Sequence, residues 1–463
     1  MNAIARASLL LLPWLAAQAA DPTPRPLFQD FMGLNAHFTF KPELYRQTVR
    51  RVRNYHNLNW DVNRPGEPAH PPLCVNRVDW KADVYGRWKA AGLETSICLQ
   101  FTGFEAATPG YQKFWVGQEQ WCFDYGRKVA SYFGPSGAEQ LCTSFEIGNE
   151  PGAKFDPALW RSLFTQMAKG IRAGDPKAKI VTATAVAREG DDYAQDLRKV
   201  YADPEMLKLY DVINLHTYSE LPRRDPSQSP WVRGYPETPG IRYLKDVDEA
   251  VAWRDQHAPG KEIWITEFGY DAGTEAAMSR RKDWALKLDW QGVSDLHQAQ
   301  YLVRSFLLFA ERDVARAYIY FFDDQDEPSV HGSSGLTRRF QPKPSFWAVR
   351  QLYQTLGDYR FERVVRQEAG KLHLYAFQPG RRAGSPIWVA WSPTGVRSDR
   401  QQGYVPRETE VTLTDLPAQP ARVLGMAVAD GAAPALPWKA AGPRAITLTI
   451  GESPAYLVFG PQP

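Results

Sequence analysis

The fold is decided at the stretch Phe145-Glu146-Ile147-Gly148-Asn149-Glu150-Pro151. A short apolar segment there runs directly into an Asn-Glu-Pro turn. We interpret it as a β-strand that carries two polar side chains into a cleft, because Pro151 cannot donate a further hydrogen bond to a sheet. Glu146 lies on the same strand face as Glu150, four residues earlier, so we expect it to point inward, where a buried carboxylate needs partners.

A second stretch, Ile263-Trp264-Ile265-Thr266-Glu267-Phe268-Gly269, repeats this design: an apolar strand, a terminal glutamate and a glycine. Two glutamates that each end a strand are the groups that retaining glycoside hydrolysis requires. In that reaction one carboxyl protonates the leaving oxygen, and the other attacks the anomeric carbon from about 5–5.5 Å away. The sequence therefore predicts a carboxylate pair, Glu150 and Glu267, in one cleft.

The two stretches resemble those of the clan A glycoside hydrolases, retaining (β/α)8 enzymes with an acid/base on strand 4 and a nucleophile on strand 7. Phe-Glu-x-x-Asn-Glu-Pro and Ile-Thr-Glu-Phe are most similar to family 39 and next to family 5, and the likeness extends over residues 31–350. The resemblance implies that Glu150 is the acid/base, that Glu267 is the nucleophile, and that Asn149 hydrogen bonds the sugar 2-hydroxyl. Family 39 usually has a tryptophan at the position of Gly148.

Strand candidates alternate with helical or polar segments along the first three quarters of the chain. Eightfold alternation favours a closed parallel (β/α)8 TIM barrel. Helices are predicted most clearly at Asp156–Ala173, with Asp156 as N-cap and Pro157 at the first helical position, and at Ser294–Asp313. The predicted strands are residues 31–38, 54–62, 93–101, 143–150, 179–185, 212–218, 262–268 and 315–322.

From residue 361 onward, short β runs alternate with turns, which predicts a C-terminal all-β sandwich domain. We therefore expect a signal peptide at 1–20, a catalytic barrel at 21–357 and a β-sandwich at 358–463. Only Gly357-Asp358-Tyr359 separates the sandwich from the last barrel helix. Such a connection is too short for a flexible tether, so the sandwich is expected to stabilise the barrel. The predicted sandwich strands are residues 372–377, 387–391, 409–413, 422–426, 445–450 and 455–459.

The composition of the chain indicates which partners it binds, and its N-terminus indicates where the protein is located. The chain has 55 basic and 52 acidic residues among 463, so no nucleic-acid-binding footprint is indicated. Residues 1–20 resemble a secretory signal, with Arg6, an apolar core at Leu9–Leu15 and a small-residue cleavage site at Ala17-Gln18-Ala19. The apolar core is too short to span a bilayer. We expect an exported protein, secreted or periplasmic, with no membrane span.

Further site candidates end the other strands, since function in such barrels lies at the carboxyl ends of the strands. His216 and Tyr218 end the sixth strand, where clan A enzymes place a His-x-Tyr against the sugar or the nucleophile; a buried core histidine and a wall tyrosine are the alternatives. A hydroxyl bonded to Glu267 would favour its ionised form, and the field of Glu267 would keep Glu150 protonated. The remaining candidates for sugar contact, each equally compatible with packing, are His37, Trp60, Asp61 and Asp323.

The function predicted is cleavage of O-glycosidic bonds of an oligo- or polysaccharide by double displacement, without a cofactor or a metal. The first alternative is a barrel that binds glycan without cleaving it, although binding alone does not need a carboxylate pair. The second is a metal-dependent hydrolase, but the eight histidines form no His-x-His or His-x-x-x-His pair. The sugar, the linkage, exo or endo action and the oligomeric state are not determined by the sequence.

Four cysteines, Cys74, Cys98, Cys122 and Cys142, allow three complete pairings, and export would permit disulfides. Cys74 follows the second strand and Cys122 begins the helix after the third, so both are expected near the barrel mouth. Cys98 and Cys142 lie on neighbouring parallel strands with an offset of roughly 13 Å, beyond the about 4.4–6.8 Å that a disulfide spans. We predict one disulfide, Cys74–Cys122, and free buried thiols at Cys98 and Cys142.

Overall fold

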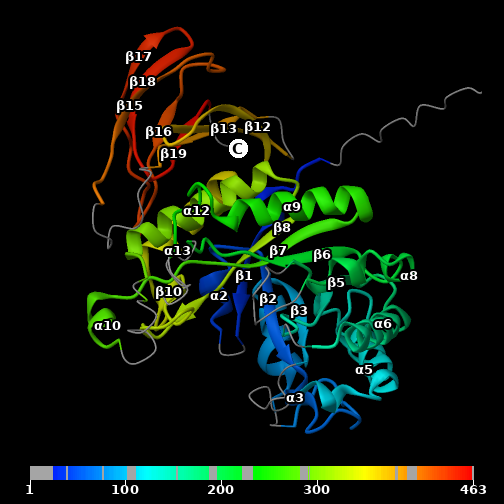
Figure 1. Ribbon diagram of the computed structural model, residues 1–463. Coiled ribbons are helices and arrows are strands. Elements are labelled where there is room, and N and C mark those ends of the chain that lie inside the picture. Colours follow the sequence, from blue (N-terminus) through cyan, green and yellow to red (C-terminus); the bar gives the residue numbers. More distant parts are fainter. Residues whose placement is uncertain are drawn as a thin grey trace, which may run out of the picture.

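A computed structural model of the chain shows eight parallel strands closed into a barrel in the order β1 to β8 (Figure 1). It describes residues 24–37, 40–75, 78–101, 111–152, 155–186, 196–221, 233–281, 290, 292–380, 384–393 and 404–460. The predicted (β/α)8 fold is confirmed. The barrel strands are β1 (Met32–Ala36), β2 (Arg51–Asn57), β3 (Glu94–Gln100), β4 (Cys142–Ile147), β5 (Lys179–Thr184), β6 (Val212–His216), β7 (Glu262–Phe268) and β8 (Arg316–Ile319).

The second strand differs most from its prediction. It begins at Arg51, three residues earlier than expected, and Leu58–Asp61 forms the short helix α3 instead of continuing the strand. The first three residues of β2 were not predicted as strand, because Arg51 and Arg53 interrupt the apolar pattern. Both guanidinium groups are paired with carboxylates, Arg51 at the amino-terminal end of the barrel and Arg53 inside it. Ion pairing thus allows two arginines in a buried strand.

Both helices predicted most clearly are confirmed, the first with its predicted Asp156 cap, and the second has a Ser294 cap that was not predicted. The Asp156 side chain accepts backbone N–H bonds at the start of α6, ahead of Pro157, and the Ser294 hydroxyl does so for α12. Such caps satisfy N–H groups that have no intrahelical partner. The described helices are α1 (Phe28–Phe31), α2 (Pro42–Tyr45), α3, a π-helical turn (Trp80–Tyr85), α4 (Gly86–Ala90), a 3-10 turn (Tyr111–Trp115), α5 (Glu119–Phe133), α6 (Pro157–Gly174), α7 (Arg198–Tyr201), α8 (Pro204–Leu207), α9 (Arg242–His257), α10 (Glu275–Ser279), α12 (Asp295–Glu311) and α13 (Pro344–Leu356).

The amino-terminal half of the barrel interior is filled by large side chains. Trp264 and Tyr318 pack there with Val181 and Val212, and all four are buried. Gly33 of β1 is required for this packing, because a Cβ at its position would lie 2.3 Å from the ring of Tyr318. The barrel is therefore closed on this side, and polar side chains gather at the opposite, carboxyl end.

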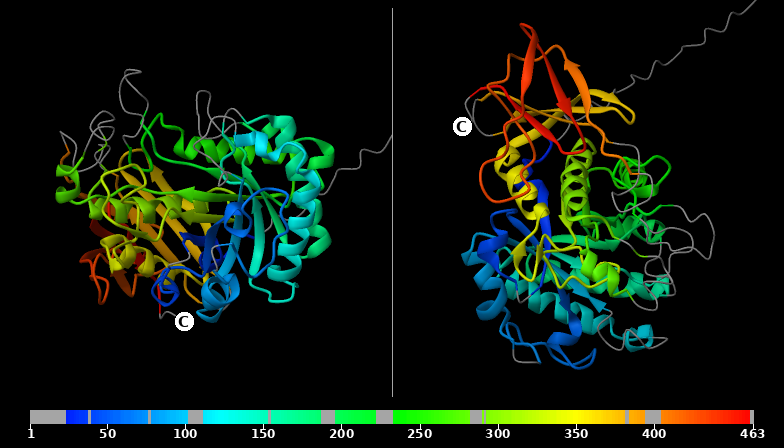
Figure 2. Two further views of the ribbon diagram at one scale, coloured as in Figure 1. Left: turned by 90° about the horizontal axis from the view of Figure 1, so that it is seen from below. Right: turned by 90° about the vertical axis from the view of Figure 1, so that its left-hand side faces the viewer.

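After α13 the chain forms a β-sandwich of two antiparallel sheets, coloured orange to red in Figures 1 and 2. The sheets have the orders β12-β13-β14-β19-β16 and β15-β18-β17 and share a common apolar core. β17 was not predicted, because its residues are largely exposed and show no apolar alternation. The strands after the barrel are β9 (Asp323–Asp324), β10 (Thr337–Arg338), β11 (Gln341–Pro342), β12 (Tyr359–Glu368), β13 (Leu372–Pro379), β14 (Ile387–Trp391), β15 (Thr409–Leu413), β16 (Arg422–Leu424), β17 (Trp438–Gly442), β18 (Ala445–Ile450) and β19 (Ala455–Val458).

The larger sheet of the sandwich has a second apolar face, which packs on the barrel domain over α12 and α13 (Figure 1). Along β13, Leu372 and Leu374 point into the sandwich core, whereas Tyr375 and Phe377 join the core of the barrel domain. Alternate side chains of one strand therefore belong to two different cores, as the twofold period of a strand allows.

Buried charges also cross this boundary. Arg304 of α12 donates to the carboxylate of Glu237 at 2.9 Å and lies 3.5 Å from Glu452, and its side chain is fully buried. Trp391 of the sandwich donates to Glu237 at 2.6 Å, and His297 of α12 lies 3.0 Å from Glu452. The barrel helix and the sandwich are thus joined by a shared ionic cluster.

The predicted disulfide Cys74–Cys122 is wrong, because all four cysteines are free and buried. The Cys74 sulfur accepts a hydrogen bond from the backbone N–H of Val78 within its own loop, while Cys122 is fully enclosed in the packing of α5. The predicted free, buried state of Cys98 and Cys142 is confirmed, and the β3–β4 register keeps them apart.

The predicted signal peptide lies outside the described residues. Among the residues that the structure describes, no helix is both long enough and apolar enough to cross a membrane.

Candidate active site

Glu150 and Glu267 meet at the carboxyl end of the barrel, just after β4 and near the end of β7. One carboxyl oxygen of each and a ring nitrogen of His216 lie within 4.8 Å of one another. Retaining glycosidases hold their two carboxyl groups about 5–5.5 Å apart, and inverting enzymes about 6.5–9.5 Å apart. The spacing is therefore of the retaining kind.

His216 links the two carboxylates, and its hydrogen-bond partners fix its tautomer. The amide N–H of Asn214 donates to Glu146 at 3.0 Å, so its oxygen accepts the hydroxyl proton of Thr266 at 2.6 Å. The Thr266 oxygen can then only accept, so at 3.0 Å it takes the Nε2–H of His216. Nδ1 of His216 lies 2.6 Å from Glu150, and this short contact holds one proton shared between imidazole and carboxyl.

Glu267 is surrounded by donors and cations that favour its ionised form. Tyr55 and Tyr218 donate their hydroxyl protons to its two oxygens at 2.6 and 3.0 Å, and Arg53 donates at 3.2 Å. Burial works to raise the pKa of Glu267, but the charges of His216 and Arg53 and the Tyr55 hydrogen bond outweigh it and hold the pKa below its ordinary value. The predicted contact between Tyr218 and Glu267 is present.

Glu150 has the opposite shift. Burial raises its pKa, and the negative charge of Glu267 adds to this, whereas the hydrogen bond and charge of His216 oppose it. The field of Glu267 was expected to cause the raised pKa of Glu150, but burial is the larger cause. Burial also opposes a charge on His216, yet the two carboxylates together raise its pKa. One glutamate is therefore set to be ionised and the other to keep its proton.

Arg53, which was not among the predicted site residues, connects the polar groups of the site from inside the barrel. Nε and Nη2 bind the two carboxylate oxygens of Glu146 at 2.7 and 2.6 Å, as a guanidinium fork does. The remaining N–H groups reach Asn35 at 2.8 Å, Asn149 at 2.6 Å and Glu267 at 3.2 Å. Both Arg53 and Glu146 are completely buried, which confirms that Glu146 points inward with a partner.

The turn between β4 and Glu150 explains the absent tryptophan. Gly148 has a φ of +80°, and a Cβ there would lie 2.3 Å from the ring of Trp160 in α6. A larger residue therefore cannot occupy the position. Asn149 follows with its amide oxygen held by Arg53 and its backbone oxygen by the N–H of Thr184 at 3.0 Å. Its amide nitrogen is thus the group left to meet a ligand.

His37 and Trp60 line the mouth of the barrel. The ring of His37 lies 6.1 Å from that of Tyr55, one of the donors to Glu267, and burial lowers its pKa. Trp60 is half-buried and stacks on Trp80 at 5.8 Å. His37 is therefore separated from Glu267 by Tyr55, while Trp60 belongs to the wall after β2.

Asp61 and Asp323, predicted as sugar contacts, are engaged by protein donors, which favours a packing role for both. The Asp61 carboxylate accepts hydrogen bonds of 2.6–2.8 Å from three buried side chains, and Oδ1 of Asp323 accepts two of 2.6–2.7 Å from the β10–β11 hairpin. The donors to Asp61 are His56, Trp80 and Tyr125, and those to Asp323 are Thr337 and Phe340.

Comparison with known proteins agrees with this geometry. The family model described as Cellulase (glycosyl hydrolase family 5) matches residues 115–300, a segment that carries both glutamates. No curated protein sequence matches the chain.

Solved structures with the same fold are similar over almost the whole chain. A family 39 glycoside hydrolase from the gut symbiont Bacteroides cellulosilyticus WH2 has a TM-score of 0.63 at 17% identity, over 94% of this chain and 81% of that one. CelM2, a bifunctional glucanase-xylanase from a metagenome library, has a TM-score of 0.59 at 14% identity, over 95% and 97%. The catalytic domain of the family 30 xylanase C from Talaromyces cellulolyticus has a TM-score of 0.54 at 11% identity, over 95% and 98%.

At these identities the structural likenesses show the fold, and the family match spans the segment with the two glutamates. The resemblance inferred from those two stretches is confirmed: the segment with the two glutamates matches the family 5 model, and the chain has the fold seen in the family 39 and family 30 glycoside hydrolases.

Proposed function

We propose that this protein is an exported retaining glycosidase in which Glu267 is the nucleophile and Glu150 is the acid/base. The observation that carries the proposal is the pair itself: two carboxyl groups, one oxygen of each within 4.8 Å of the other, whose pKa values are shifted in opposite directions. An ionised nucleophile beside a protonated acid is the starting state of double displacement.

In the first half-reaction Glu267 attacks the anomeric carbon while Glu150 protonates the leaving oxygen, so the glycosidic bond breaks and a glycosyl ester forms on Glu267. The proton on Glu150 is the one it shares with Nδ1 of His216. In the second half-reaction Glu150 takes a proton from water, which attacks the same carbon and releases Glu267. The loss of negative charge on Glu267 in the intermediate lowers the pKa of Glu150, which suits it to act as a base.

The substrate is held by neighbouring groups with free hydrogen-bonding capacity. Asn149 presents its amide N–H2 beside Glu150 because Arg53 occupies its oxygen, and it is the candidate partner of the sugar 2-hydroxyl. His37 and Tyr218 are further candidates at the same end of the barrel, and Trp60 at its wall. Carbohydrate is thus the proposed partner, and residues 1–20 are proposed to direct export. The mass of the mature protein tests export.

The experiment is a screen of aryl glycosides and polysaccharides that covers pentoses, hexoses and uronic acids. On a substrate so found, Glu267→Ala should abolish turnover and be partly rescued by azide to give a glycosyl azide of inverted configuration. Glu150→Ala should lose most activity on substrates with poor leaving groups, because activated aryl groups need no protonation.

Near wild-type rates in both variants would refute the assignment, and product of inverted configuration from the wild type would refute the mechanism. Binding of glycan without turnover would indicate the non-catalytic alternative. Loss of turnover on addition of a chelator would indicate the metal-dependent hydrolase, since Glu150, His216 and Glu267 are also spaced as metal ligands could be.

A further inference from the structure

The segment between β9 and β10, residues 325–336, carries His331 close to the proposed catalytic pair. This histidine was not a predicted site residue and has no role in the proposed mechanism. The ring of His331 lies 4.9 Å from that of Tyr218 and 5.1 Å from that of Tyr320. Tyr218 donates to Glu267 at 3.0 Å. One side chain therefore separates His331 from the proposed nucleophile.

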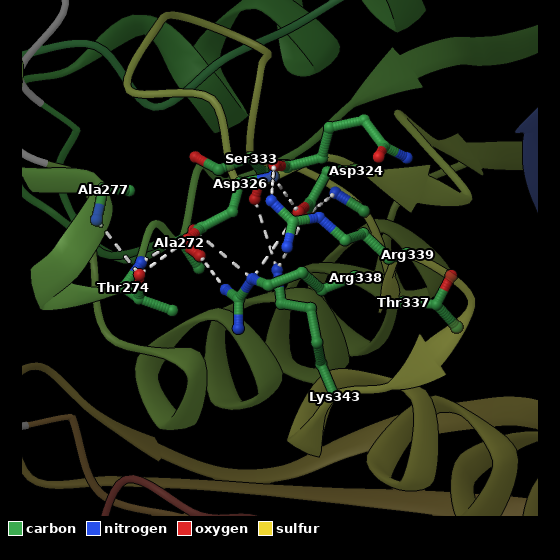
Figure 3. A network of polar contacts seen from close by, with 12 residues as sticks. Ala272, Thr274, Ala277, Asp324, Asp326, Ser333, Thr337, Arg338, Arg339 and Lys343 are labelled. Atoms are coloured by element: carbon green, nitrogen blue, oxygen red, sulfur yellow. Dashed lines mark hydrogen bonds and ion pairs between the residues drawn. The ribbon is translucent and has the colours of Figure 1, made fainter. Parts of the chain in front are cut away.

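A buried ionic network holds this loop in place (Figure 3). The carboxylate of Asp324 accepts a hydrogen bond from Lys343 at 3.0 Å, and Lys343, which is almost fully buried, also donates to the backbone oxygen of Ser333 at 3.2 Å. Asp326 accepts from the backbone N–H and hydroxyl of Thr274 at 2.9 and 2.6 Å. These hydrogen bonds fix the loop backbone on both sides of His331, at Asp326 and at Ser333. The position of the imidazole is therefore well defined, as a substrate-contacting group requires.

His331 itself has two unfavourable features. Its φ is +64°, in the left-handed region that residues other than glycine rarely adopt. Its Nδ1 atom is buried without a hydrogen-bond partner, whereas buried polar atoms in proteins are nearly always paired. Strained backbone conformations cluster at active sites and ligand clamps, and an unpaired buried nitrogen calls for a functional explanation, such as a partner supplied by a ligand.

The charge state of His331 suits a hydroxyl. Burial and the charge of Arg233 lower its pKa, although Asp271 and Glu267 oppose this, so the neutral form of the ring is favoured. A neutral imidazole offers one N–H donor and one nitrogen acceptor. A sugar hydroxyl can both donate and accept, and so matches either nitrogen.

We propose that His331 is a specificity-determining residue, which hydrogen bonds one hydroxyl of the sugar bound at Glu267. This inference rests on the proposed glycosidase function. The β9–β10 loop would then distinguish one sugar from another by a single hydroxyl, while the carboxylate pair performs the chemistry.

The test uses His331→Gly, which removes the ring and tolerates the positive φ, and His331→Gln, which retains a donor and an acceptor. Ser329→Gly, in the same turn, is the matched control. For each protein kcat/KM is measured on the best aryl glycoside from the screen and on its monodeoxy analogues. His331→Gly should lower kcat/KM about tenfold on the parent, the loss of one hydrogen bond. On the one analogue that lacks the contacted hydroxyl, wild type and variant should have the same kcat/KM, because the hydrogen bond is absent from both complexes.

His331→Gln should recover part of the activity, and Ser329→Gly should behave as the wild type. A loss of less than twofold on the parent, or an equal loss on every deoxy analogue, overturns the proposal, since the latter shows a structural effect only. Glu267→Ala is assayed in parallel. If that variant is inactive while His331→Gly matches the wild type, only the role of His331 fails; if Glu267→Ala keeps its activity, the proposed function itself fails.

Discussion

Replacement of Arg53 is expected to separate stability from catalysis in this barrel. Arg53→Met leaves the Glu146 carboxylate completely buried with two weaker neutral donors, Asn214 at 3.0 Å and the Cys98 thiol at 3.6 Å. Removing one partner of a buried ion pair costs about 3–5 kcal/mol, because the other charge stays in the interior uncompensated. The same change takes a cation away from Glu267 and frees the amide oxygen of Asn149. We therefore expect kcat/KM to fall by about 10²-fold or more through misplacement of these groups.

The double variant Arg53→Met/Glu146→Leu distinguishes the two effects. It removes the uncompensated charge, so most of the lost free energy of unfolding should return, but Glu267 and Asn149 stay unsupported and activity should not. Urea unfolding followed by tryptophan fluorescence gives the stability, and kcat/KM on the screened substrate gives the activity. A destabilisation below about 1 kcal/mol in the single variant, which is the range of an exposed pair, or recovery of activity together with stability in the double variant, would refute the reasoning.

Further outcomes are expected at other sites. Tyr55→Phe removes the 2.6 Å hydrogen bond that lowers the pKa of Glu267, so the acid limb of the kcat/KM profile should move to higher pH; an unmoved limb contradicts this. Burial raises the pKa of Glu452, but His297 and Arg304 outweigh it and lower the pKa from 4.5 to about 2. The resulting stabilisation, about 3 kcal/mol, is present above pH 4.5 and is lost as the pH falls toward 2. Glu452→Gln should therefore reduce the unfolding free energy at pH 6 and much less at pH 3, and equal losses in urea unfolding at both would argue against it. Thiol titration of the denatured, unreduced protein should find four free thiols, and a count of two would instead support the Cys74–Cys122 disulfide. Truncation after residue 357 exposes the apolar face that β13 covers and should give insoluble or less heat-stable barrel; a soluble, fully active truncate would show that the sandwich is dispensable.

The sequence by itself determined the barrel and the place of its two glutamates. Strand–helix alternation, the Asp156 cap and the apolar runs are local features, since each depends on residues only a few positions apart. The Asn-Glu-Pro turn and the glycine after Glu267 end their strands locally as well. In a closed parallel barrel all strand ends of one kind lie on the same side, so the meeting of Glu150 and Glu267 followed from the local pattern and the fold class together.

Only the tertiary structure decided what surrounds that pair. Arg53 and Tyr55 break the apolar pattern of β2, and nothing near them in the chain indicates their partners, which lie on β4 and β7. Asp61 and Asp323 are hydrogen bonded by protein donors, and Cys74 forms no disulfide with Cys122, because loop paths depend on contacts between segments far apart in sequence. Barrel closure and strand register fix such contacts through three-dimensional packing, whereas secondary structure is set by neighbours along the chain. The pair of carboxylates could therefore be found from the sequence, and the groups that set their pKa values could not.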